Sequence, residues 1–490
     1  MSASISQKTQ LFLDDHLIDD TVNLCRQMKQ PVKHPANPLF GQDRPWEDQS
    51  LVYVSVLFDD DLDRFRCWYM AAEAFRQTLP DQPEIAKLGK YYVCYAESID
   101  GIHWTKPAVG RSGLSDHAGH NIVIPGGHGV CVLKTPDDPD PRRRYKAVGG
   151  NVVACSPDGI AWTLRDWADA VGKNDTCPSL VQWEGQYLAY VRNQEDDPEW
   201  PGVMRGVGLC ASDDFDHWTP KSSIFTTDKR DGYPWVQPHA LCVTRYGDVL
   251  IGLLPILEIV PEPGNNILGD MPVQLVVSRD GRQWHRVADR GAFLPQETAG
   301  PIGRRSWDLR FHPASHFFVK DDVIHLYYYG SLQRWGEGAW LAGRQKFGHR
   351  DDRVGEAHDL YPARRYGVGL ATLPADRFVS VRPVNWAAEG RLTTVPVACA
   401  GRDLLVNASV DAGDLLVELL DDDGDVIPGF DRSRSHLDAC DALRHRVLWQ
   451  EKGLEKPLAA ALQDRRSISF RFILRNCELF AFQVTGNDRR

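Results

Sequence analysis

The sequence lacks several features that mark common classes of protein. Its 490 residues contain no run near the roughly 20 apolar residues that a membrane span needs, and the polar start MSASISQKTQ has no apolar core of a signal peptide. The 11 cysteines are an odd number at wide spacings without a Cys-x-x-Cys pair, which disfavours a disulfide framework or a zinc site. We therefore expect a cytoplasmic protein that needs no metal and no other cofactor.

Positive charge is also scarce. Lys and Arg number 56 against 67 Asp and Glu, a net charge of −11, and the longest basic run is Arg142-Arg143-Arg144. Glycine-rich phosphate loops and nucleophile-elbow patterns are absent, and the histidines have no metal-ligand spacing. We therefore expect neither a nucleic-acid nor a membrane partner, and no P-loop or serine-hydrolase chemistry.

What the sequence does contain is one pattern in four copies. The copies span residues 98–104, 156–162, 212–218 and 278–284, and in each a Ser is followed two residues later by Asp and six residues later by Trp. An apolar, β-prone run precedes every copy, and Gly stands after the Asp in three of them. This order predicts a strand, a tight turn capped by Ser and Asp, and a second short strand against which the Trp packs.

The copies belong to a longer repeat. Their starts lie 58, 56 and 66 residues apart, and four β-prone runs can be traced for each, with a fifth, degenerate unit ending near Phe378. Repetition of a four-stranded unit predicts an all-β fold, here a five-bladed β-propeller over residues 46–388. Residues 1–45, which are rich in proline near their end, are predicted to form an N-terminal wrapping segment, and residues 389–490 a C-terminal β-sandwich.

The propeller geometry separates structural from functional candidates. The first strand of each blade lines the central channel, so the loops that enter these strands share one face, and the repeated Ser-x-Asp turns lie on the other. We therefore interpret the turns as structural. The loops of the functional face offer carboxylates, aromatic residues, Arg and His that converge on one axis, as glycosidic bond cleavage requires.

Each acidic candidate also has a structural interpretation. Glu47 and Asp48 precede a strand and could be solvated loop acids. Asp175 could cap a turn, and Glu258 could mark the end of an apolar strand. Asp308 stands between Trp307 and Leu309, which favours a position facing the channel.

Several stretches together resemble a known group of proteins. They are LFLDDHLID, HPANPLF, RPWED, FRCWYMA, YAESIDGIHWTKP, RRYKAV, SRDGRQWHR, GVGLATL, DRFVSV and GRLTTVPV. The sequence resembles bacterial proteins related to glycoside hydrolase families 32 and 43, which pair a five-bladed propeller with a C-terminal β-sandwich. The family-32 pattern Trp-x-Asn-Asp-Pro-x-Gly is absent, as are the Arg-Asp-Pro and Glu-Cys motifs; Trp46-Glu47-Asp48 occupies the corresponding first-blade position.

The residues and the resemblance together predict a glycoside hydrolase that cleaves a small saccharide or glycoside, furanosides included. The predicted catalytic acids are Glu47, Asp175 and Asp308. The predicted substrate-binding residues are Trp46, Asp48, His120, Asn121, Arg192, His239, Glu258 and Trp335. Two alternatives stay open: a non-catalytic propeller that binds a carbohydrate or a protein, and a glycoside phosphorylase, which needs an Arg and His cluster for phosphate beside one acid.

Overall fold

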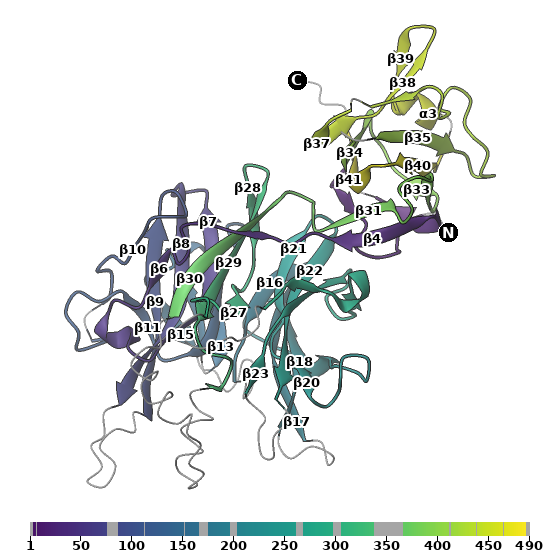
Figure 1. Cartoon of the computed structure of the whole chain (residues 1–490). Helices are drawn as coiled ribbons and strands as arrows, with labels where there is room; N and C mark the ends of the chain where they lie inside the picture. Colours follow the sequence, from purple (N-terminus) through teal and green to yellow (C-terminus); the bar gives the residue numbers. More distant parts are fainter. Residues whose placement is uncertain are drawn as a thin grey trace.

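The chain folds almost entirely into β-strands. The computed structural model describes residues 3–5, 7–75, 87–111, 113–150, 152–165, 175–196, 203–260, 268–296, 305–337, 366–410, 413–437, 439–463 and 465–486. Within these ranges the helical elements are short: η1 (Pro45–Glu47), η2 (Pro141–Arg143), η3 (Ala288–Arg290) and α3 (Ala459–Leu462). The predicted all-β class is confirmed (Figure 1).

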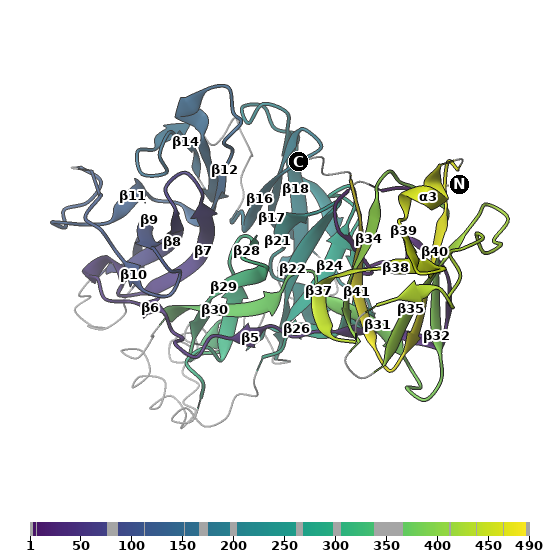
Figure 2. The ribbon, with the colours of Figure 1, turned by 90° about the horizontal axis from the view of Figure 1, so that it is seen from above.

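Five antiparallel sheets follow one another along the larger part of the molecule (Figures 1 and 2). The first holds β7 (Ser50–Asp59), β8 (Arg64–Phe75), β9 (Lys87–Ser98), β10 (Trp104–Thr105) and β11 (Ile122–Pro125). The second holds β12 (His128–Lys134), β13 (Tyr145–Gly150), β14 (Val152–Ser156) and β15 (Thr163–Arg165), and the third β16 (Ser179–Trp183), β17 (Gln186–Asp196), β18 (Val203–Ser212) and β19 (Ser222–Phe225). The fourth holds β20 (Val236–Pro238), β21 (Cys242–Tyr246), β22 (Val249–Ile259), β23 (Gly269–Asp270), β24 (Val273–Ser278), β25 (His285–Arg286) and β26 (Ala292–Leu294). The fifth holds β27 (Arg310–Pro313), β28 (Phe318–Lys320), β29 (Val323–Ser331) and β30 (Tyr366–Pro374).

The innermost strands of these sheets meet through buried serine hydroxyls. Ser55 Oγ in β7 lies 2.8 Å from Ser315 Oγ, just after β27, and accepts a hydrogen bond from Val132 N in β12 at 3.1 Å. Ser179 Oγ in β16 donates to the Ser315 carbonyl at 3.0 Å and accepts from Val243 N in β21 at 2.9 Å. All five sheets therefore converge on one axis, as the blades of a propeller do.

The repeated turns adopt the predicted capped geometry. In the first, Ser98 Oγ accepts from Gly101 N at 2.9 Å, and Asp100 Oδ1 accepts from the next two backbone N–H groups, both at 2.8 Å. The same contacts recur in the other three copies. The glycine position needs a left-handed φ, +77° at Gly101, and Phe215 adopts +67° in the third copy. The structural interpretation of these turns is confirmed.

Each turn is also held by a side chain of the preceding sheet. Trp68 Nε1 donates to Gly159 O at 2.7 Å, Arg143 Nη2 to Asp214 O at 2.5 Å, Tyr190 Oη to Gly281 O at 3.0 Å, Tyr246 Oη to Asp376 Oδ1 at 2.6 Å, and Tyr327 Oη to Gly101 O at 2.9 Å. The last of these joins the fifth sheet to the first. The turns therefore link neighbouring sheets as well as neighbouring strands.

Two further sheets pack face to face in the smaller part of the molecule. One contains β2 (Gln10–Leu11), β4 (Leu24–Met28), β31 (Val379–Pro383), β34 (Asp403–Ser409), β37 (Asp441–Arg446) and β41 (Glu478–Thr485), and the other β3 (Ile18–Val22), β32 (Gly390–Thr394), β35 (Asp414–Leu420) and β40 (Ser469–Arg475). Phe12, Val417, Phe472 and Phe482 belong to one apolar core between them, as in a β-sandwich. The remaining strands are β1 (Ala3–Ser4) with β33 (Val397–Ala398), and β36 (Ser435–His436) with β38 (Leu448–Glu451) and β39 (Leu454–Lys456).

The N-terminal segment, predicted to wrap the molecule, takes part in both groups of sheets. Strands β2, β3 and β4 pair with β41, β32 and β31 of the smaller part. The next strands, β5 (Val32–Lys33) and β6 (Phe40–Gly41), pair with β30 of the fifth sheet. The segment therefore connects the two parts, as the purple chain in Figure 1 shows. The domain boundaries at 45 and 388 stay predictions.

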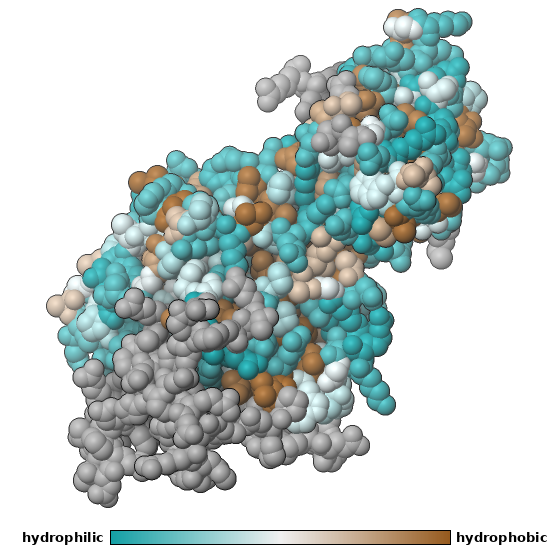
Figure 3. Space-filling model, viewed as in Figure 1, coloured by the Kyte–Doolittle hydropathy of each residue, from teal (hydrophilic) through white to brown (hydrophobic). Residues whose placement is uncertain are grey.

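Among the residues that are coloured by hydropathy in Figure 3, hydrophilic ones predominate, and the apolar patches between them are small. In the ranges that the structure describes, no helix is long and apolar enough to cross a membrane.

Candidate functional site

Charged, imidazole and aromatic side chains gather where the innermost strands begin. We call this group the axial cluster. Its members are Tyr53 (β7), His128 (β12), Asp175 (before β16), Arg192 (β17), Arg205 (β18), His239 (after β20), Arg310 and His312 (β27), Tyr329 (β29) and Trp335. The first, second, third and fifth sheets contribute residues from their strands, and the fourth sheet contributes His239 from the loop after β20. The fold therefore brings together residues that are far apart in the sequence.

Asp175 is the carboxylate of the axial cluster. Its Oδ1 lies 3.0 Å from His128 Nδ1, and its Oδ2 is ion-paired with Arg192. The hydrogen bond from His128 lowers the pKa of Asp175 to about 2, with help from the charge of Arg192 and against the effect of burial. Its side chain is 38% exposed, whereas that of Arg192 is 7% exposed. Asp175 is therefore an ionised group at the solvent-facing side of the cluster.

Arg192 connects Asp175 to the buried side of the cluster. Its Nη2 lies 3.4 Å from Tyr53 Oη and 3.2 Å from His239 Nε2. Tyr53 has a positive φ of 49° at a register shift in the pairing of β7 with β8. A tyrosine with left-handed backbone angles costs free energy, and such strained residues are concentrated at functional sites. A bulge in a strand redirects the side chain at that position.

His239, His312 and Tyr329 form the buried side. The ring centroids of His239 and His312 are 5.5 Å apart, and His312 stacks on Tyr329 at 5.2 Å. Burial lowers the pKa of His312 to about 4. Burial and the charge of Arg192 lower the pKa of His239 well below its ordinary value. Both imidazoles are therefore neutral at pH 7. Among the residues that the structure describes, His239 Nδ1, His312 Nε2 and Tyr329 Oη are buried without a hydrogen-bond partner.

Two further arginines lie beside these rings. The Arg310 guanidinium carbon is 4.8 Å from the Trp335 ring centroid, and the ring centroids of Trp335 and His239 are 4.1 Å apart. Arg205 donates to Gln237 at 3.4 Å, and burial together with Arg192 lowers its pKa to about 10. The guanidinium groups of Arg192, Arg205 and Arg310 therefore lie in the same cluster as the Asp175 carboxylate.

Four of the predicted site residues belong to this cluster. They are Asp175, Arg192, His239 and Trp335. The other predicted residues lie elsewhere, and in the described part of the chain no hydrogen bond or ion pair joins Glu47 or Asp308 to Asp175.

Glu47 belongs to a buried network beside the first sheet. Its carboxylate accepts hydrogen bonds from Lys106 at 2.8 and 2.9 Å and from Tyr69 at 2.6 Å, and its side chain is 0% exposed. Tyr69 accepts from Asn121 at 2.7 Å, and Trp46 donates to Asn121 at 3.0 Å. Of the predicted set, Glu47, Trp46 and Asn121 thus hold one another and the first sheet together.

Asp308 is also neutralised by a lysine. Its Oδ2 is 2.8 Å from Lys33 Nζ in β5 and accepts from Tyr328 Oη at 2.8 Å, while Ser306 donates to Oδ1. Burial works to raise its pKa, but the bonds from Lys33 and Ser306 outweigh burial and lower it. Asp308 therefore fastens the N-terminal segment to the fifth sheet.

The last three predicted residues lie at separate places. Asp48 is exposed at the end of η1. His120 is buried, and its ring centroid is 6.4 Å from that of Trp46. Its Nδ1 accepts a hydrogen bond from Ile122 N at 3.2 Å. Glu258 is exposed near the end of β22, opposite Asp270 of β23.

The axial cluster also contains five residues that were not predicted from the sequence: His128, His312, Arg310, Tyr53 and Tyr329. The prediction looked for site residues at first-strand starts, and in the second sheet that start is His128, the first residue of β12. In the fifth sheet it is Arg310, the first residue of β27, with His312 two residues later on the same face. Tyr53 gave no signal, because its position depends on a bulge.

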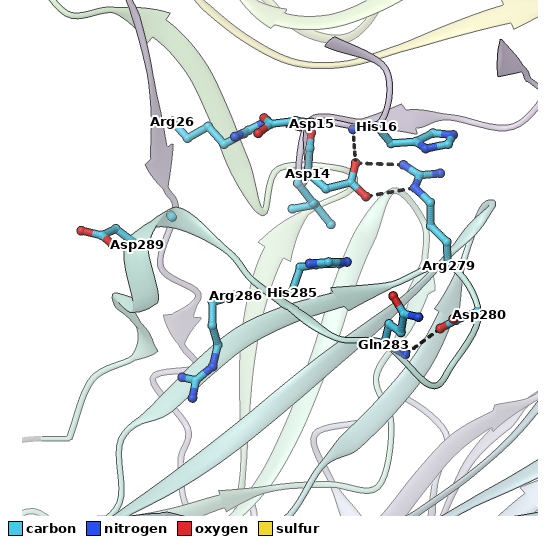
Figure 4. A pocket seen from close by; sticks show the side chains of 12 residues that line it. Asp14, Asp15, His16, Arg26, Arg279, Asp280, Gln283, His285, Arg286 and Asp289 are labelled. Atoms are coloured by element: carbon cyan, nitrogen blue, oxygen red, sulfur yellow. Dashed lines mark hydrogen bonds and ion pairs between the residues drawn. The ribbon is translucent and has the colours of Figure 1, made fainter. Parts of the chain in front are cut away.

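A separate cavity of about 910 Å³ lies at the junction of the two parts of the molecule (Figure 4). Asp14 and Arg279 point toward each other there and form two hydrogen bonds of 2.9 and 3.0 Å. Asp15 pairs with Arg26, and Asp289 with Arg230. Because its acids are neutralised by neighbouring arginines or by turn hydrogen bonds, this cavity is a weaker candidate for catalysis than the axial cluster.

Within the ranges that the structure describes, no three His, Cys, Asp or Glu side chains gather closely enough to hold a metal ion.

Comparison with known proteins gives distant structural likenesses. No family model and no curated protein matches the sequence. A glycosyl hydrolase from Bacteroides ovatus is 15% identical with a TM-score of 0.43, covering 71% of this chain and 95% of that chain. The β-1,2-mannobiose phosphorylase of Listeria innocua is 11% identical with a TM-score of 0.42, covering 71% and 97%. The GH32 β-fructofuranosidase of Bombyx mori is 11% identical with a TM-score of 0.36, covering 92% and 95%. Identities and TM-scores this low do not carry the chemistry of those proteins over to this chain.

Proposed function

We propose that the protein is a carbohydrate-active enzyme that cleaves a glycosidic bond of a small saccharide or glycoside at the axial cluster. The observation that carries the proposal is the ionised Asp175 held between His128 and Arg192 at the partly exposed side of the cluster. A carboxylate with perturbed pKa beside buried polar groups is the usual sign of a reaction centre.

The contacts of Asp175 support two roles. With a pKa of about 2 it stays ionised at neutral pH, which suits a group that stabilises developing positive charge on the sugar. His128 is hydrogen-bonded to it and is the neighbouring group able to carry a proton to the leaving oxygen. In this reading Asp175 orients the imidazole, as the acid of a catalytic triad does.

Aromatic faces around the cluster support a sugar as the substrate. The Tyr91 ring lies 5.3 Å from His128, and Trp335 lies over His239 and Arg310. Both side chains are only partly buried, so they can offer apolar surface to the C–H face of a sugar ring. The resemblance to glycosidase propellers supports the same class of substrate.

The test compares matched carboxylates on a panel of aryl pyranosides and furanosides. Asp175→Asn should lower turnover by at least about 100-fold, the scale of general acid–base catalysis. Asp308→Asn, which removes a buried charge outside the cluster, should leave the turnover of the folded fraction within about threefold, on the expectation that residues outside the reaction centre act through stability. Full turnover in Asp175→Asn would overturn the proposal, and loss of sugar binding without any measurable cleavage would favour the binding propeller.

A further inference from the structure

We propose that three unpaired groups on the buried side of the axial cluster bind one hydroxyl group of the substrate and thereby determine its specificity. The groups are Nδ1 of His239, Nε2 of His312 and Oη of Tyr329. This inference rests on the proposed function and deepens it, because it names the part of the sugar that the site recognises.

The three groups belong to neighbouring side chains that are almost fully buried. His239 and His312 are each 1% exposed, and Tyr329 is 0% exposed. The ring centroid of His312 lies 5.5 Å from that of His239 and 5.2 Å from that of Tyr329. In the described part of the chain none of the three atoms has a hydrogen-bond partner. A buried polar group without a partner costs about 1 to 3 kcal/mol, so three of them in one cluster indicate a site for a polar ligand.

The contact with Arg192 determines which nitrogen of His239 carries the proton. Burial and the charge of Arg192 hold the pKa of His239 well below its ordinary value, so the ring has a single proton at pH 7. A guanidinium group can only donate, and its Nη2 lies 3.2 Å from Nε2 of His239. Nε2 is therefore the acceptor, and Nδ1 of His239 is a hydrogen-bond donor.

His312 has the opposite arrangement. Its pKa of about 4 also leaves one proton on the ring at pH 7. Nδ1 lies 2.8 Å from the carbonyl oxygen of Pro313 and must donate to it, so Nε2 is an acceptor. Burial raises the pKa of Tyr329 well above its ordinary value, and its phenol keeps a proton that it can donate. The three unpaired groups are thus two donors and one acceptor.

A hydroxyl group has the complementary capacity. It donates one hydrogen bond, here to His312, and its two lone pairs accept from His239 and Tyr329. A carboxylate only accepts and would leave Nε2 of His312 unpaired, whereas an ammonium group only donates and would face the N–H of His239. A sugar hydroxyl is therefore the group that pairs all three atoms.

Arg192 connects this site to the proposed reaction centre. Its Nη1 is ion-paired with Asp175, and its Nη2 lies beside His239. The planar guanidinium group therefore fixes the His239 ring relative to the carboxylate. The side chain of Asp175 is 38% exposed, so a substrate can approach from that side. A sugar held by its hydroxyl at the three groups is thereby positioned relative to Asp175.

The test uses the full-length protein and a panel of methyl pyranosides and furanosides of the common hexoses and pentoses, each with its monodeoxy analogues. Calorimetric titration measures binding, and aryl glycosides of the same sugars measure kcat/KM. For the preferred sugar, removal of one particular hydroxyl should weaken binding or lower kcat/KM at least about 100-fold, because three buried groups lose their partner. If every monodeoxy analogue behaves within about threefold of its parent sugar, the proposal is overturned.

Fluorine in place of the same hydroxyl isolates the contact with His312. Fluorine can accept a hydrogen bond but cannot donate one, so Nε2 of His312 stays unpaired. The deoxyfluoro analogue should therefore bind at least about tenfold more weakly than the parent sugar. Equal binding of the deoxyfluoro analogue and the parent sugar would contradict the assignment of His312 as an acceptor and overturn the proposal.

Two variants of His312 test the same contact from the protein. His312→Asn keeps an N–H near the position of Nδ1 for the Pro313 carbonyl and lacks an acceptor at the position of Nε2. The ratio of kcat/KM, or of affinity, between parent sugar and deoxy sugar should fall at least about tenfold in this variant. His312→Gln can place its Oε1 near the position of Nε2 and should keep more of the ratio. A purely structural role would affect both sugars alike and leave the ratio unchanged.

His325→Asn is the matched control. His325 lies in β29 outside the axial cluster, with Nδ1 3.1 Å from the carbonyl oxygen of Val323, and its ring stacks on Phe318. This variant should keep the parental ratio. If His312→Asn does not fold, Tyr329→Phe, which removes only the buried hydroxyl, should lower the ratio at least about threefold. An unchanged ratio in whichever of these two variants folds and is used would overturn the proposal.

The outcomes separate this proposal from the proposed function. Hydroxyl-dependent binding without cleavage of any glycoside would support the hydroxyl site and refute the proposed function. Cleavage with the same ratio in the parent protein and in folded His312→Asn would refute the hydroxyl site and leave the proposed function in place. A water molecule bound to the three groups in crystals of the sugar-bound protein would also refute the hydroxyl site. Neither binding nor cleavage of any glycoside in the panel would overturn both.

Discussion

Tyr327 Oη in the fifth sheet donates a hydrogen bond of 2.9 Å to the carbonyl oxygen of Gly101 in the turn of the first sheet. The two residues are 226 positions apart, and their bond joins the last of the five sheets to the first. Trp104 packs against the same tyrosine ring at 5.7 Å. The repeated geometry of the turns thus also links the sheets, because each turn presents a carbonyl or carboxylate oxygen to a side chain of the neighbouring sheet.

Removing this bond should destabilise the ring of sheets. Tyr327→Phe keeps the ring packing and leaves Trp104 Nε1 as the remaining donor to the Gly101 carbonyl, so we expect the loss of one hydrogen bond, about 1 kcal/mol in the free energy of unfolding. Urea denaturation at pH 7 measures it. Leu164→Ala, at an exposed position, serves as a control and should change stability by less than about 0.5 kcal/mol. A Tyr327→Phe protein as stable as the parent would show that the bond does not help to close the ring.

Glu47 should behave as a structural acid. Glu47→Gln leaves the Lys106 ammonium buried, 5% exposed, without its principal counter-charge, and we expect a loss on the order of 3 kcal/mol in stability. The double variant Glu47→Gln, Lys106→Met removes both charges and should recover much of that loss. Thermal denaturation of both variants checks this. Unchanged stability of Glu47→Gln combined with a large fall in turnover would contradict the structural role and support the prediction of Glu47 as a catalytic acid.

The sequence predicted the fold well because its signals are local. Ser98, Asp100 and Trp104 lie within one turn, and their hydrogen bonds span three residues or fewer, so their spacing alone indicates a strand pair. The partner of that turn, Tyr327, is set by tertiary structure and carries no local mark.

The candidate site was predicted in part for the same reason. Asp175 and His239 stand at first-strand entrances and were found from strand order. His120 precedes β11, which pairs with the first sheet through Ile122 and Cys94, whereas the first strand of the second sheet begins at His128. The ion pair of Glu47 could not be predicted from the sequence, because Lys106 lies 59 residues away.

The stability of the protein should fall on mild acidification because of His312. Its pKa is about 4 in the folded state against an ordinary 6.5, so the unfolded chain binds more protons between these values. The contribution of neutral His312 to the free energy of unfolding is fully present above pH 6.5. It is lost at about 1.4 kcal/mol per pH unit as the pH falls from 6.5 toward 4. Below pH 4 this loss stops.

Replacement of the buried ring tests this dependence. Urea denaturation of His312→Gln between pH 7 and 4.5 should show a shallower loss of stability than the parent protein. His103→Gln, with a side chain 88% exposed, should keep the parental slope. Identical slopes for parent and His312→Gln would mean that His312 is not the group responsible.

His128 offers the sharpest test of the proton transfer at Asp175. The 3.0 Å contact between His128 Nδ1 and Asp175 fixes the ring, so His128→Ala should lower turnover about 100-fold while Asp175 keeps its ion pair with Arg192. Added imidazole should restore part of the activity, and more of it as the pH approaches the pKa of free imidazole, because the lost group is a proton carrier. His103→Ala should change neither turnover nor the response to imidazole. If His128 only positions Asp175, imidazole will restore nothing, and the acid of the reaction must be another group.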